Sequence, residues 1–489
     1  MIYCGVTLRL LQDDIHNRHR IFAMLFIEYL QDARHLRRNQ CKSLWIWRKT
    51  YDKKQLNDTI MIERKNEPLE PEYVFSAEIV VTEWTNQGLV RGVIVTAGDP
   101  NLPEGSIVEF IGGIPGERVL ADIKFFAVWR PKQAVQRKYA ITVREVIASA
   151  SQQRTQPRCQ HFGACGSCRL QHLTYEAQLQ WKWDRVYLEF AKWSLNTSAL
   201  QPVIGAENPW NYRNHMRFSV NSQGKAGLTF FQSHQIIPLT ECPIAHPTIN
   251  RILQALASIR LAKPQIGIRC GANTGEALLF PQVENLPAAE LAQEGIAVQK
   301  ETLRETIGGC VFTIRANSFF QTNTPQAEKM AQLVLNAAPR SSNPAIADAY
   351  SGVGVFAALL AKFGAGRIAA IEESAAAVKD AKANFAALGI SDVEMICGKV
   401  EEILPLRQDR FDAIIIDPPR AGCYPQVLQA ILEQQIPHVI YISCDPATLA
   451  RDTHILCAGG YRLLSAQPLD MFPHTYHIEC VVLLSIVKE

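Results

Sequence analysis

This chain of 489 residues has no hydrophobic segment that could cross a membrane as a helix, because no apolar run reaches the ~18–20 residues that a bilayer requires. Its amino end has no signal-peptide layout either, since Asp13 and Asp14 interrupt it early and no small-residue cleavage site follows. Internal repeats and long low-complexity tracts are also absent. We therefore expect a cytoplasmic monomer that works away from membranes and has length for more than one domain.

Neither sign of charge dominates the chain. It has 50 Lys and Arg residues against 47 Asp and Glu residues, for a net charge of +3. Such a balance permits an RNA partner without arguing for one. Thirteen cysteines scattered over a long chain exclude a small disulfide scaffold and favour a reduced protein with metal-binding or catalytic thiols.

The first half of the chain divides into three stretches. Residues 1–70 contain a basic run with two tryptophans, and are interpreted mainly as a poorly ordered extension, with an RNA-binding arm as the alternative. Residues 71–148 have five short apolar runs between Gly and Pro turns, which is typical of a small OB-like barrel that binds nucleic acid or only packs on its neighbour. Residues 149–330 form a middle α+β region.

Residues 331–489 alternate between apolar strand patterns and Ala-rich helical patterns. This alternation predicts an α/β, Rossmann-like domain with an open and mostly parallel sheet. The expected strands are residues 345–350, 368–371, 393–397, 413–417 and 439–443, with 478–486 closing the sheet.

Three cysteines lie within ten residues at the start of the middle region: Cys159, Cys165 and Cys168. Cys242 is the natural fourth ligand. All-thiolate ligation suits either a 4Fe-4S cluster or a structural zinc, which the spacing separates poorly. Unrelated buried cysteines are the remaining interpretation.

A glycine-containing loop, Asp348-Ala349-Tyr350-Ser351-Gly352-Val353-Gly354, follows a strand and opens a helix. It is not GxGxxG and no phosphate-binding lysine follows, which disfavours a dinucleotide or nucleoside triphosphate. Glu372, at the end of the next strand, could accept both hydroxyls of a ribose. The arrangement is typical of S-adenosylmethionine binding; a structural turn beside a solvated Glu372 is the alternative.

Asp417-Pro418-Pro419-Arg420 lies at the end of a later strand. Consecutive prolines stiffen this loop and hold Asp417 where a methyl donor and a flat acceptor would meet. Similar loops with an aromatic fourth residue occur in enzymes that methylate exocyclic nitrogens. Here the fourth residue is Arg420 and a cysteine, Cys444, follows on the next strand.

Cys444 and Glu479 suit the methylation of carbon 5 of a uracil, which is a poor nucleophile. A thiolate that adds to carbon 6 activates carbon 5, and a base then removes the proton from carbon 5. On a strand, His477 would share a face with Glu479 and could position it. The alternatives are a buried, inert thiol at Cys444 and an Arg-paired structural carboxylate at Glu479.

These motifs resemble the RNA uracil-5 methyltransferase family. The matching segments are Asn317 to Asn323, Asp417 to Arg420, Ser443 to Pro446 and Phe472 to Glu479, and the likeness covers roughly residues 75–489. The resemblance implies Cys444 as nucleophile, Glu479 as proton acceptor, and S-adenosylmethionine contacts from Gln321, Tyr350, Glu372 and Asp417. It also implies that Cys159, Cys165, Cys168 and Cys242 are the 4Fe-4S ligands of the family's ribosomal branch.

The resemblance also indicates a substrate. Gly113 to Val119 is similar to the TRAM domain, an RNA-binding barrel. A barrel together with a cysteine group is typical of the branch that acts on large-subunit (23S) ribosomal RNA, whereas the transfer-RNA branch generally lacks both. The chain departs from the family pattern at Ser351, where a cysteine is usual, and at Val355, where a polar residue is common.

The target uracil must be extruded from folded RNA to reach Cys444. Candidate phosphate contacts, each equally well a solvated charge, are Arg154, Arg158, Arg169, Lys182, Arg213 and Arg217. Two other classes of function stay open: a methyltransferase acting on an exocyclic nitrogen or small molecule, and a non-catalytic RNA-binding iron–sulfur protein.

Overall fold

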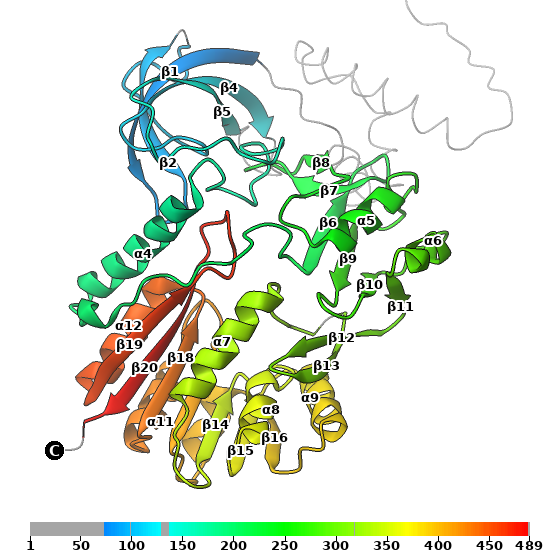
Figure 1. Cartoon of the computed structure of the whole chain (residues 1–489). Coiled ribbons are helices and arrows are strands. Elements are labelled where there is room, and N and C mark those ends of the chain that lie inside the picture. Colours follow the sequence, from blue (N-terminus) through cyan, green and yellow to red (C-terminus); the bar gives the residue numbers. More distant parts are fainter. Residues whose placement is uncertain (1–72, 98, 129–135, 317, 488–489) are drawn as a thin grey trace, which may run out of the picture. The chain divides into compact units, whose positions relative to one another are not determined.

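The computed structural model describes residues 73–97, 99–128, 136–316 and 318–487, all within one compact unit, residues 66–489 (Figure 1). The interpretation of residues 1–70 lies outside these ranges. No helix in the described part of the chain is long and apolar enough to span a membrane.

The first sheet has five antiparallel strands in the order β3-β2-β1-β4-β5. They are β1 (Tyr73–Trp84), β2 (Val90–Ala97), β3 (Ile107–Phe110), β4 (Arg118–Val128) and β5 (Gln136–Ala148). The sheet curls so that its two edges meet through a bridge between Ile111 and Thr142. Its inner face buries side chains such as Ile79, Ile94 and Ile123. The expectation of five strands is confirmed, but β1, β4 and β5 have 12, 11 and 13 residues and are longer than the short runs expected. Their curvature gives a barrel-like sheet.

The central region contains a second sheet, in the order β11-β10-β9-β6-β7-β8, and a hairpin of β12 and β13. The strands are β6 (His215–Val220), β7 (Ala226–Thr229), β8 (Ile236–Pro238), β9 (Gln265–Cys270), β10 (Glu276–Phe280), β11 (Ala297–Gln299), β12 (Thr302–Ile307) and β13 (Cys310–Arg315). The helices are α4 (Tyr175–Lys192), η2 (Thr197–Ala199), α5 (Pro247–Leu256), α6 (Ala288–Gln293) and α7 (Thr324–Ala337).

The last sheet has seven strands in the order β16-β15-β14-β17-β18-β20-β19. They are β14 (Ala345–Ala349), β15 (Arg367–Glu372), β16 (Val393–Cys397), β17 (Ala413–Ile416), β18 (His438–Ser443), β19 (Tyr461–Leu469) and β20 (Glu479–Ile486). The helices between them are α8 (Val355–Lys362), α9 (Ala375–Ala387), α10 (Val400–Ile403), η3 (Leu404–Leu406), α11 (Pro425–Glu433) and α12 (Pro446–Ala458). Strands β14 to β18 pair in parallel, and β20 is antiparallel to both β18 and β19.

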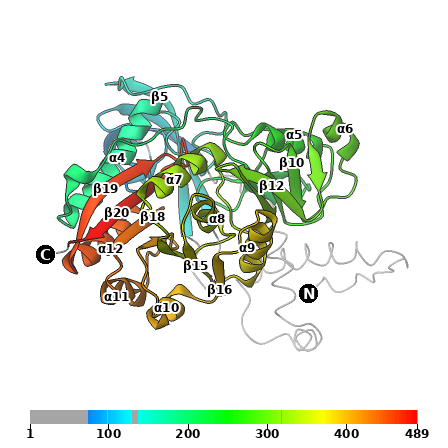
Figure 2. The same ribbon diagram turned by 60° about the horizontal axis from the view of Figure 1, so that its bottom comes forward.

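Both faces of this sheet are buried, which explains the continuous apolar runs of its strands. Ile414 and Ile416 point into a core shared with α4, α10, α11 and α12. Ala413 and Ile415 point into the opposite core, shared with α7, α8 and α9. Figure 2 shows the two helical layers on either side of the strands. The doubly wound α/β architecture is therefore confirmed.

Two features of this sheet differ from the sequence-based expectation. Strand β19 was not expected, and β20 begins at Glu479 rather than at residue 478. Residues 200–204 of the central region also pair with β19, through bridges from Leu200 to Ala466 and from Ile204 to Leu469. The central region thus adds an edge segment to the last sheet.

Candidate functional site

Four candidate residues gather at one edge of the last sheet because each follows or ends a parallel strand. Tyr350 follows β14, Glu372 ends β15, Asp417 follows β17 and Cys444 follows β18. In a doubly wound sheet, ligands bind outside the carboxyl ends of the strands where the strand order reverses, here between β14 and β17. The Asp417 amide donates to Ala349 O at 3.4 Å across that point.

Glu479 reaches the same edge by a different route. Strand β20 runs antiparallel to β18, with Ser443 opposite Cys480. That register places Glu479, one residue before Cys480, beside Cys444, one residue after Ser443. The sheet therefore brings together a thiol and a carboxyl group from opposite strand ends.

The Cys444 thiol is half-buried between β18 and the amino end of α12. Burial raises its pKa to about 11, the Glu479 charge adds to the rise, and Arg420 lowers it by charge and by a hydrogen bond to the sulfur. The helix amino end also favours a negative charge nearby. Arg420 is thus the group that makes a thiolate at Cys444 accessible.

Glu479 and Asp417 are two carboxyl groups in one low-dielectric site. Burial raises the pKa of Asp417 to about 7. Burial, and then the charge of Asp417, raise the pKa of Glu479 well above its usual range, while Arg420 offsets part of this rise. A carboxylate with a raised pKa is a stronger base than a solvated one, which is the property that proton abstraction requires.

His477 does not share a strand face with Glu479, because β20 begins only at Glu479. Arg420 Nη2 instead donates to His477 Nδ1 at 2.8 Å. Burial and the Arg420 charge lower the pKa of His477 to about 3, so its ring is neutral and can accept this bond. His477 therefore orients Arg420 rather than Glu479.

The loop after β14 forms a cradle that fits a nucleoside. Glu372 Oε2 accepts from the Gly352 amide at 3.0 Å and its Oε1 accepts from the Ser374 amide at 2.7 Å. A carboxylate so held keeps lone pairs free for the two hydroxyls of a ribose. No residue in the described part of the chain forms a hydrogen bond with the buried Tyr350 hydroxyl, and Tyr350 is held at φ +65°. An orphaned polar atom and a strained backbone fit a site built for a ligand.

Gln321 lies just before α7, apart from this cradle. Its carbonyl accepts from Asn214 Nδ2 at 3.2 Å. Two residues later, Asn323 Nδ2 donates to Met471 O at 2.9 Å, which joins the start of α7 to the segment before Glu479. Among the described residues, no hydrogen bond links the Gln321 side chain to Tyr350, Glu372 or Asp417.

Residues 470–478, which we call the catalytic loop, connect β19 to Glu479 and are held by the central region. Lys182 on α4 is fully buried and pairs with Asp470, and it donates to Phe472 O at 3.0 Å. Tyr212 Oη donates to Pro473 O at 3.0 Å. These contacts hold the backbone that leads to Glu479.

Lys182 is therefore a structural cation, and its interpretation as a phosphate contact is wrong. Arg154 is likewise engaged in contacts within the protein, since it pairs with the buried Glu117 and donates to Gly112 O at 2.8 Å. Arg158 and Arg217 lie over the rings of Trp210 and Phe280, at 5.4 and 5.9 Å from the ring centres.

The four cysteines of the central region, which we call the cysteine group, carry free thiols near one another: Cys159, Cys165, Cys168 and Cys242. Burial raises the pKa of Cys242 to about 11, and the charges of Cys159 and Cys165 raise it further. Burial and the other three thiols also raise the pKa of Cys168. Among the described residues, no three Cys, His, Asp or Glu side chains surround a point where a single metal ion could sit.

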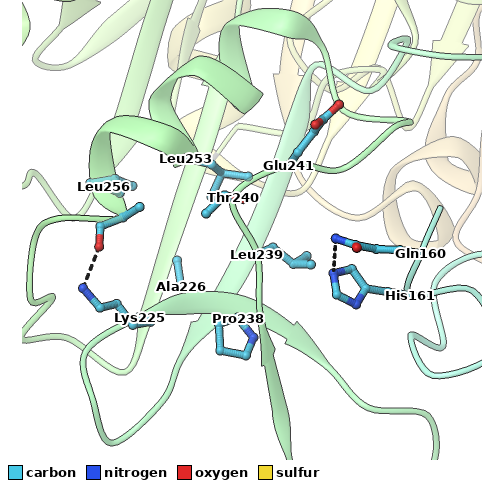
Figure 3. A pocket seen from close by; sticks show the side chains of 11 residues that line it. Gln160, His161, Lys225, Ala226, Pro238, Leu239, Thr240, Glu241, Leu253 and Leu256 are labelled. Atoms are coloured by element: carbon cyan, nitrogen blue, oxygen red, sulfur yellow. Dashed lines mark hydrogen bonds between the residues drawn. The ribbon is translucent and has the colours of Figure 1, made fainter.

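A hollow of about 250 Å³ lies beside the cysteine group (Figure 3). Gln160 and His161, which follow Cys159, line one side of it, and Thr240 and Glu241, which precede Cys242, line another. Both chain segments that carry these cysteines thus border an open space.

Sequence reasoning missed two residues of the site. Arg420 was noted only as a departure from an aromatic position, and Tyr476 was not assigned any role. Both lie inside motifs quoted above, and the Arg420 guanidinium interacts electrostatically with both Cys444 and Tyr476. Arg420 is recognisable as a functional residue from its place among the Cys444 thiol and the neutral rings of Tyr476 and His477. That arrangement depends on contacts between distant loops, so it is not visible in the sequence.

Comparisons with known proteins agree with this geometry. A family model described as tRNA (uracil-5-)-methyltransferase matches residues 291–487. An uncharacterized RNA methyltransferase of Caldanaerobacter subterraneus subsp. tengcongensis is 32% identical over 78% of this chain and 93% of its own length. One of Bacillus anthracis is 33% identical over 78% of this chain and 92% of its own.

A solved structure has a similar fold. The tRNA (uracil-54, C5)-methyltransferase of Pyrococcus abyssi, in complex with S-adenosyl-L-homocysteine, covers 83% of this chain and 99% of its own, with a TM-score of 0.60 and 24% identity. That likeness concerns the fold, whereas the relatives that are more than 30% identical share most of both chains. The chain therefore belongs to the RNA (uracil-5-)-methyltransferase family.

Proposed function

We propose that this RNA methyltransferase uses S-adenosylmethionine to methylate carbon 5 of a uridine in large-subunit ribosomal RNA. The observation that carries the proposal is the convergence of Cys444, Arg420, Glu479 and Asp417 beside the nucleoside cradle of Tyr350 and Glu372. A thiol with a cation and a strong base within one site matches the chemistry of uracil methylation.

Cys444 is the proposed nucleophile. Its thiolate adds to carbon 6 of the uracil, so the electrons of the double bond move to carbon 5 and the O4 enolate. Arg420 stabilises the thiolate before the addition, since its charge and hydrogen bond lower the pKa of Cys444 against the effect of burial. S-adenosylmethionine, when bound in the cradle, supplies a methyl group as an electrophile to carbon 5.

Glu479 is the proposed base. Its carboxylate takes the proton that carbon 5 still carries after methylation, and the released electron pair re-forms the double bond and expels the Cys444 thiolate. Its raised pKa suits this step, and the neighbouring Asp417 helps to raise it. Asp417 lies at the strand switch point, where it can contact the cofactor or the uracil edge.

The cradle residues and Gln321 are the proposed cofactor contacts. Glu372 would hold the ribose hydroxyls, and the buried Tyr350 hydroxyl still needs a partner. Gln321 would approach from the side of α7, beside Phe319, whose ring is 68% exposed. Such an exposed aromatic face, on the segment that precedes Gln321, offers a surface on which an extruded base can stack.

We further propose that the cysteine group binds a 4Fe-4S cluster. Burial, and then the charges of neighbouring thiols, raise the pKa of Cys168 and Cys242, so a cationic centre would stabilise their thiolates. No three of the described Cys, His, Asp or Glu side chains surround a single metal position, so the proposal is based on the spacing of the four cysteines and on their free thiols. When bound, the cluster would tie the segment around Cys168 to the segment around Cys242.

Transfer RNA is the second candidate substrate, because the solved transfer-RNA methyltransferase of Pyrococcus abyssi matches 83% of this chain. The ribosomal assignment is supported by the barrel-like sheet together with the cysteine group, which resemble that branch of the family. It is tested with tritiated S-adenosylmethionine and two transcripts, large-subunit ribosomal RNA and a transfer RNA pool, each digested to nucleosides. We expect labelled 5-methyluridine from the ribosomal transcript only. Label in transfer RNA alone would show that transfer RNA is the substrate. Label in another nucleoside would contradict the proposed chemistry.

A further inference from the structure

Arg169, the residue after Cys168, lies between two aromatic rings. Its guanidinium carbon is 4.5 Å from the centre of the Tyr476 ring and 5.4 Å from the centre of the Phe231 ring. Phe231 belongs to the segment after β7, and Tyr476 belongs to the catalytic loop. A planar guanidinium packs well against aromatic faces, and such contacts hold both partners in orientation.

The position of Arg169 is itself fixed. Its Nη1 donates to Gln87 O at 2.7 Å, and its backbone amide donates to His474 O at 3.0 Å. Gly88 packs so closely on the catalytic loop that a Cβ there would lie 2.9 Å from Tyr476 Cβ. The Tyr476 ring is thus confined on one side by the barrel-like sheet and on another by Arg169.

Tyr476 in turn contacts the group that controls the nucleophile. The Arg420 guanidinium interacts electrostatically with the Tyr476 hydroxyl and with the Cys444 sulfur. His477, whose ring centre is 4.0 Å from that of Tyr476, accepts a hydrogen bond from the same guanidinium at 2.8 Å. Contacts therefore run from Arg169 through Tyr476 and His477 to Arg420, whose charge acts on Cys444.

We infer that Arg169 is a positioning residue for methylation: it holds Tyr476, which holds Arg420 against the Cys444 sulfur. This inference rests on the proposed function of Cys444 as nucleophile. It gives Arg169 a role other than a phosphate contact, and it makes the segment next to Cys168 part of the apparatus that activates a distant thiol. The other charged groups facing Cys444 are Glu479 and Asp417, and the charge of Arg420 also lowers the pKa of Glu479.

The test measures the reactivity of Cys444 in the full-length protein without RNA. Iodoacetamide labelling is followed by mass spectrometry on the peptide that contains Cys444, from about pH 7 to pH 10. We expect Arg169→Met to slow labelling at about pH 8 by roughly three- to tenfold, the size of an upward shift of half to one pKa unit. Tyr476→Phe, which removes only the oxygen that Arg420 contacts, should give the same shift.

The double variant distinguishes a chain of contacts from two independent effects. Arg169→Met combined with Tyr476→Phe should label no more slowly than either single variant, because both substitutions remove the same support of Arg420. If Arg169→Met does not fold, Arg169→Lys, which keeps the charge and loses the planar stack, takes its place. An additive slowing in the double variant would overturn the inference.

Arg185→Met is the matched control. Arg185 also lies over an aromatic ring, that of Trp181 at 5.8 Å, and donates to Asn86 next to Gln87, but it does not touch Tyr476. It should leave the Cys444 labelling profile unchanged. In methylation assays, Arg169→Met should lower kcat while the KM for RNA stays constant.

A raised KM with an unchanged labelling profile would make Arg169 a phosphate contact and overturn the inference. Failure of the proposed function looks different. In that case wild-type enzyme would not methylate uridine, whatever the labelling profiles of the variants show.

Discussion

Burial raises the pKa of Cys444 and of Cys242 alike to about 11, but the charges around the two thiols differ. In the cysteine group, neighbouring thiols add to the effect of burial on Cys168 and Cys242. At Cys444, a guanidinium that is oriented by His477 and Tyr476 favours the thiolate. The thiols of the cysteine group would thus need a bound cation to balance their charge, whereas the thiol of Cys444 has the Arg420 guanidinium beside it.

This difference explains how one chain can contain both thiols that bind a metal centre and a thiol that reacts with a substrate. A thiolate that is surrounded by thiolates gains most from an inorganic centre, whereas a lone thiolate beside Arg420 stays available to attack a substrate. The catalytic loop also contacts the segment that follows Cys168, because the amides of Arg169 and Leu170 donate to His474 O and Arg169 packs on Tyr476.

The largest expected effect comes from removing the reacting thiol. Cys444→Ser should lower methylation by at least about a thousandfold, because a hydroxyl is a far weaker nucleophile. Iron content should not change, since the cysteine group is untouched. Cys457→Ser, in the following helix α12, is the control and should keep near wild-type activity. A Cys444→Ser enzyme with substantial activity would favour methylation of an exocyclic nitrogen.

Replacing the base should trap the reaction rather than prevent it. Glu479→Gln should lower kcat by about 10²–10⁴-fold, because the carbon 5 proton is no longer removed. A denaturation-resistant complex with unmodified RNA should then accumulate, visible as a slow band on a denaturing gel. A slow enzyme without such a complex would place Glu479 in the first step instead.

The pH dependence should distinguish the two sites without any substitution. Cys444 has a raised pKa of about 11, caused first by burial, so its thiolate fraction grows as pH rises toward that value. We expect kcat/KM to increase by up to about tenfold per pH unit between roughly pH 7 and 9. Iron content over this range should stay constant. A rate that falls with rising pH would contradict a thiolate that forms from a neutral thiol.

The smallest expected effect tests the connection between the two sites. Cys168→Ser should remove iron and sulfide and lower methylation by only about two- to tenfold, through the order of Arg169 and the catalytic loop. Metal analysis and single-turnover rates measure both quantities. Full activity without iron would show that the cysteine group has no influence on the reaction at Cys444. Full iron content in the variant would exclude Cys168 as a ligand.

Much of this site could be predicted from the sequence because strand ends are local features. Glu372, Asp417 and Cys444 each lie at the carboxyl end of an apolar run, and parallel strands bring such ends to one edge. Glu479 was expected as the base from the chemistry and from the resemblance, but its place beside Cys444 depends on the antiparallel register of β20, which the sequence does not show.

The contacts between distant segments could not be predicted. Lys182 has the pattern of a surface cation on an amphipathic helix, and only its pairing with Asp470, 288 residues away, explains its burial. His477 was expected to face Glu479 because the strand was placed one residue too early. Strand β19 was missed, and its polar Gln467 and Pro468 weaken the apolar alternation on which strand prediction depends.

The central claim is that Cys444 forms a covalent bond with uracil during methylation. Wild-type protein is incubated with S-adenosylmethionine and large-subunit ribosomal RNA that contains 5-fluorouridine, whose fluorine cannot leave as a proton does. We expect a denaturation-resistant complex whose cross-linked peptide carries a methylated fluorouridine on Cys444. Methyl transfer to ordinary RNA with no such complex, or a cross-link to any other residue, would contradict it.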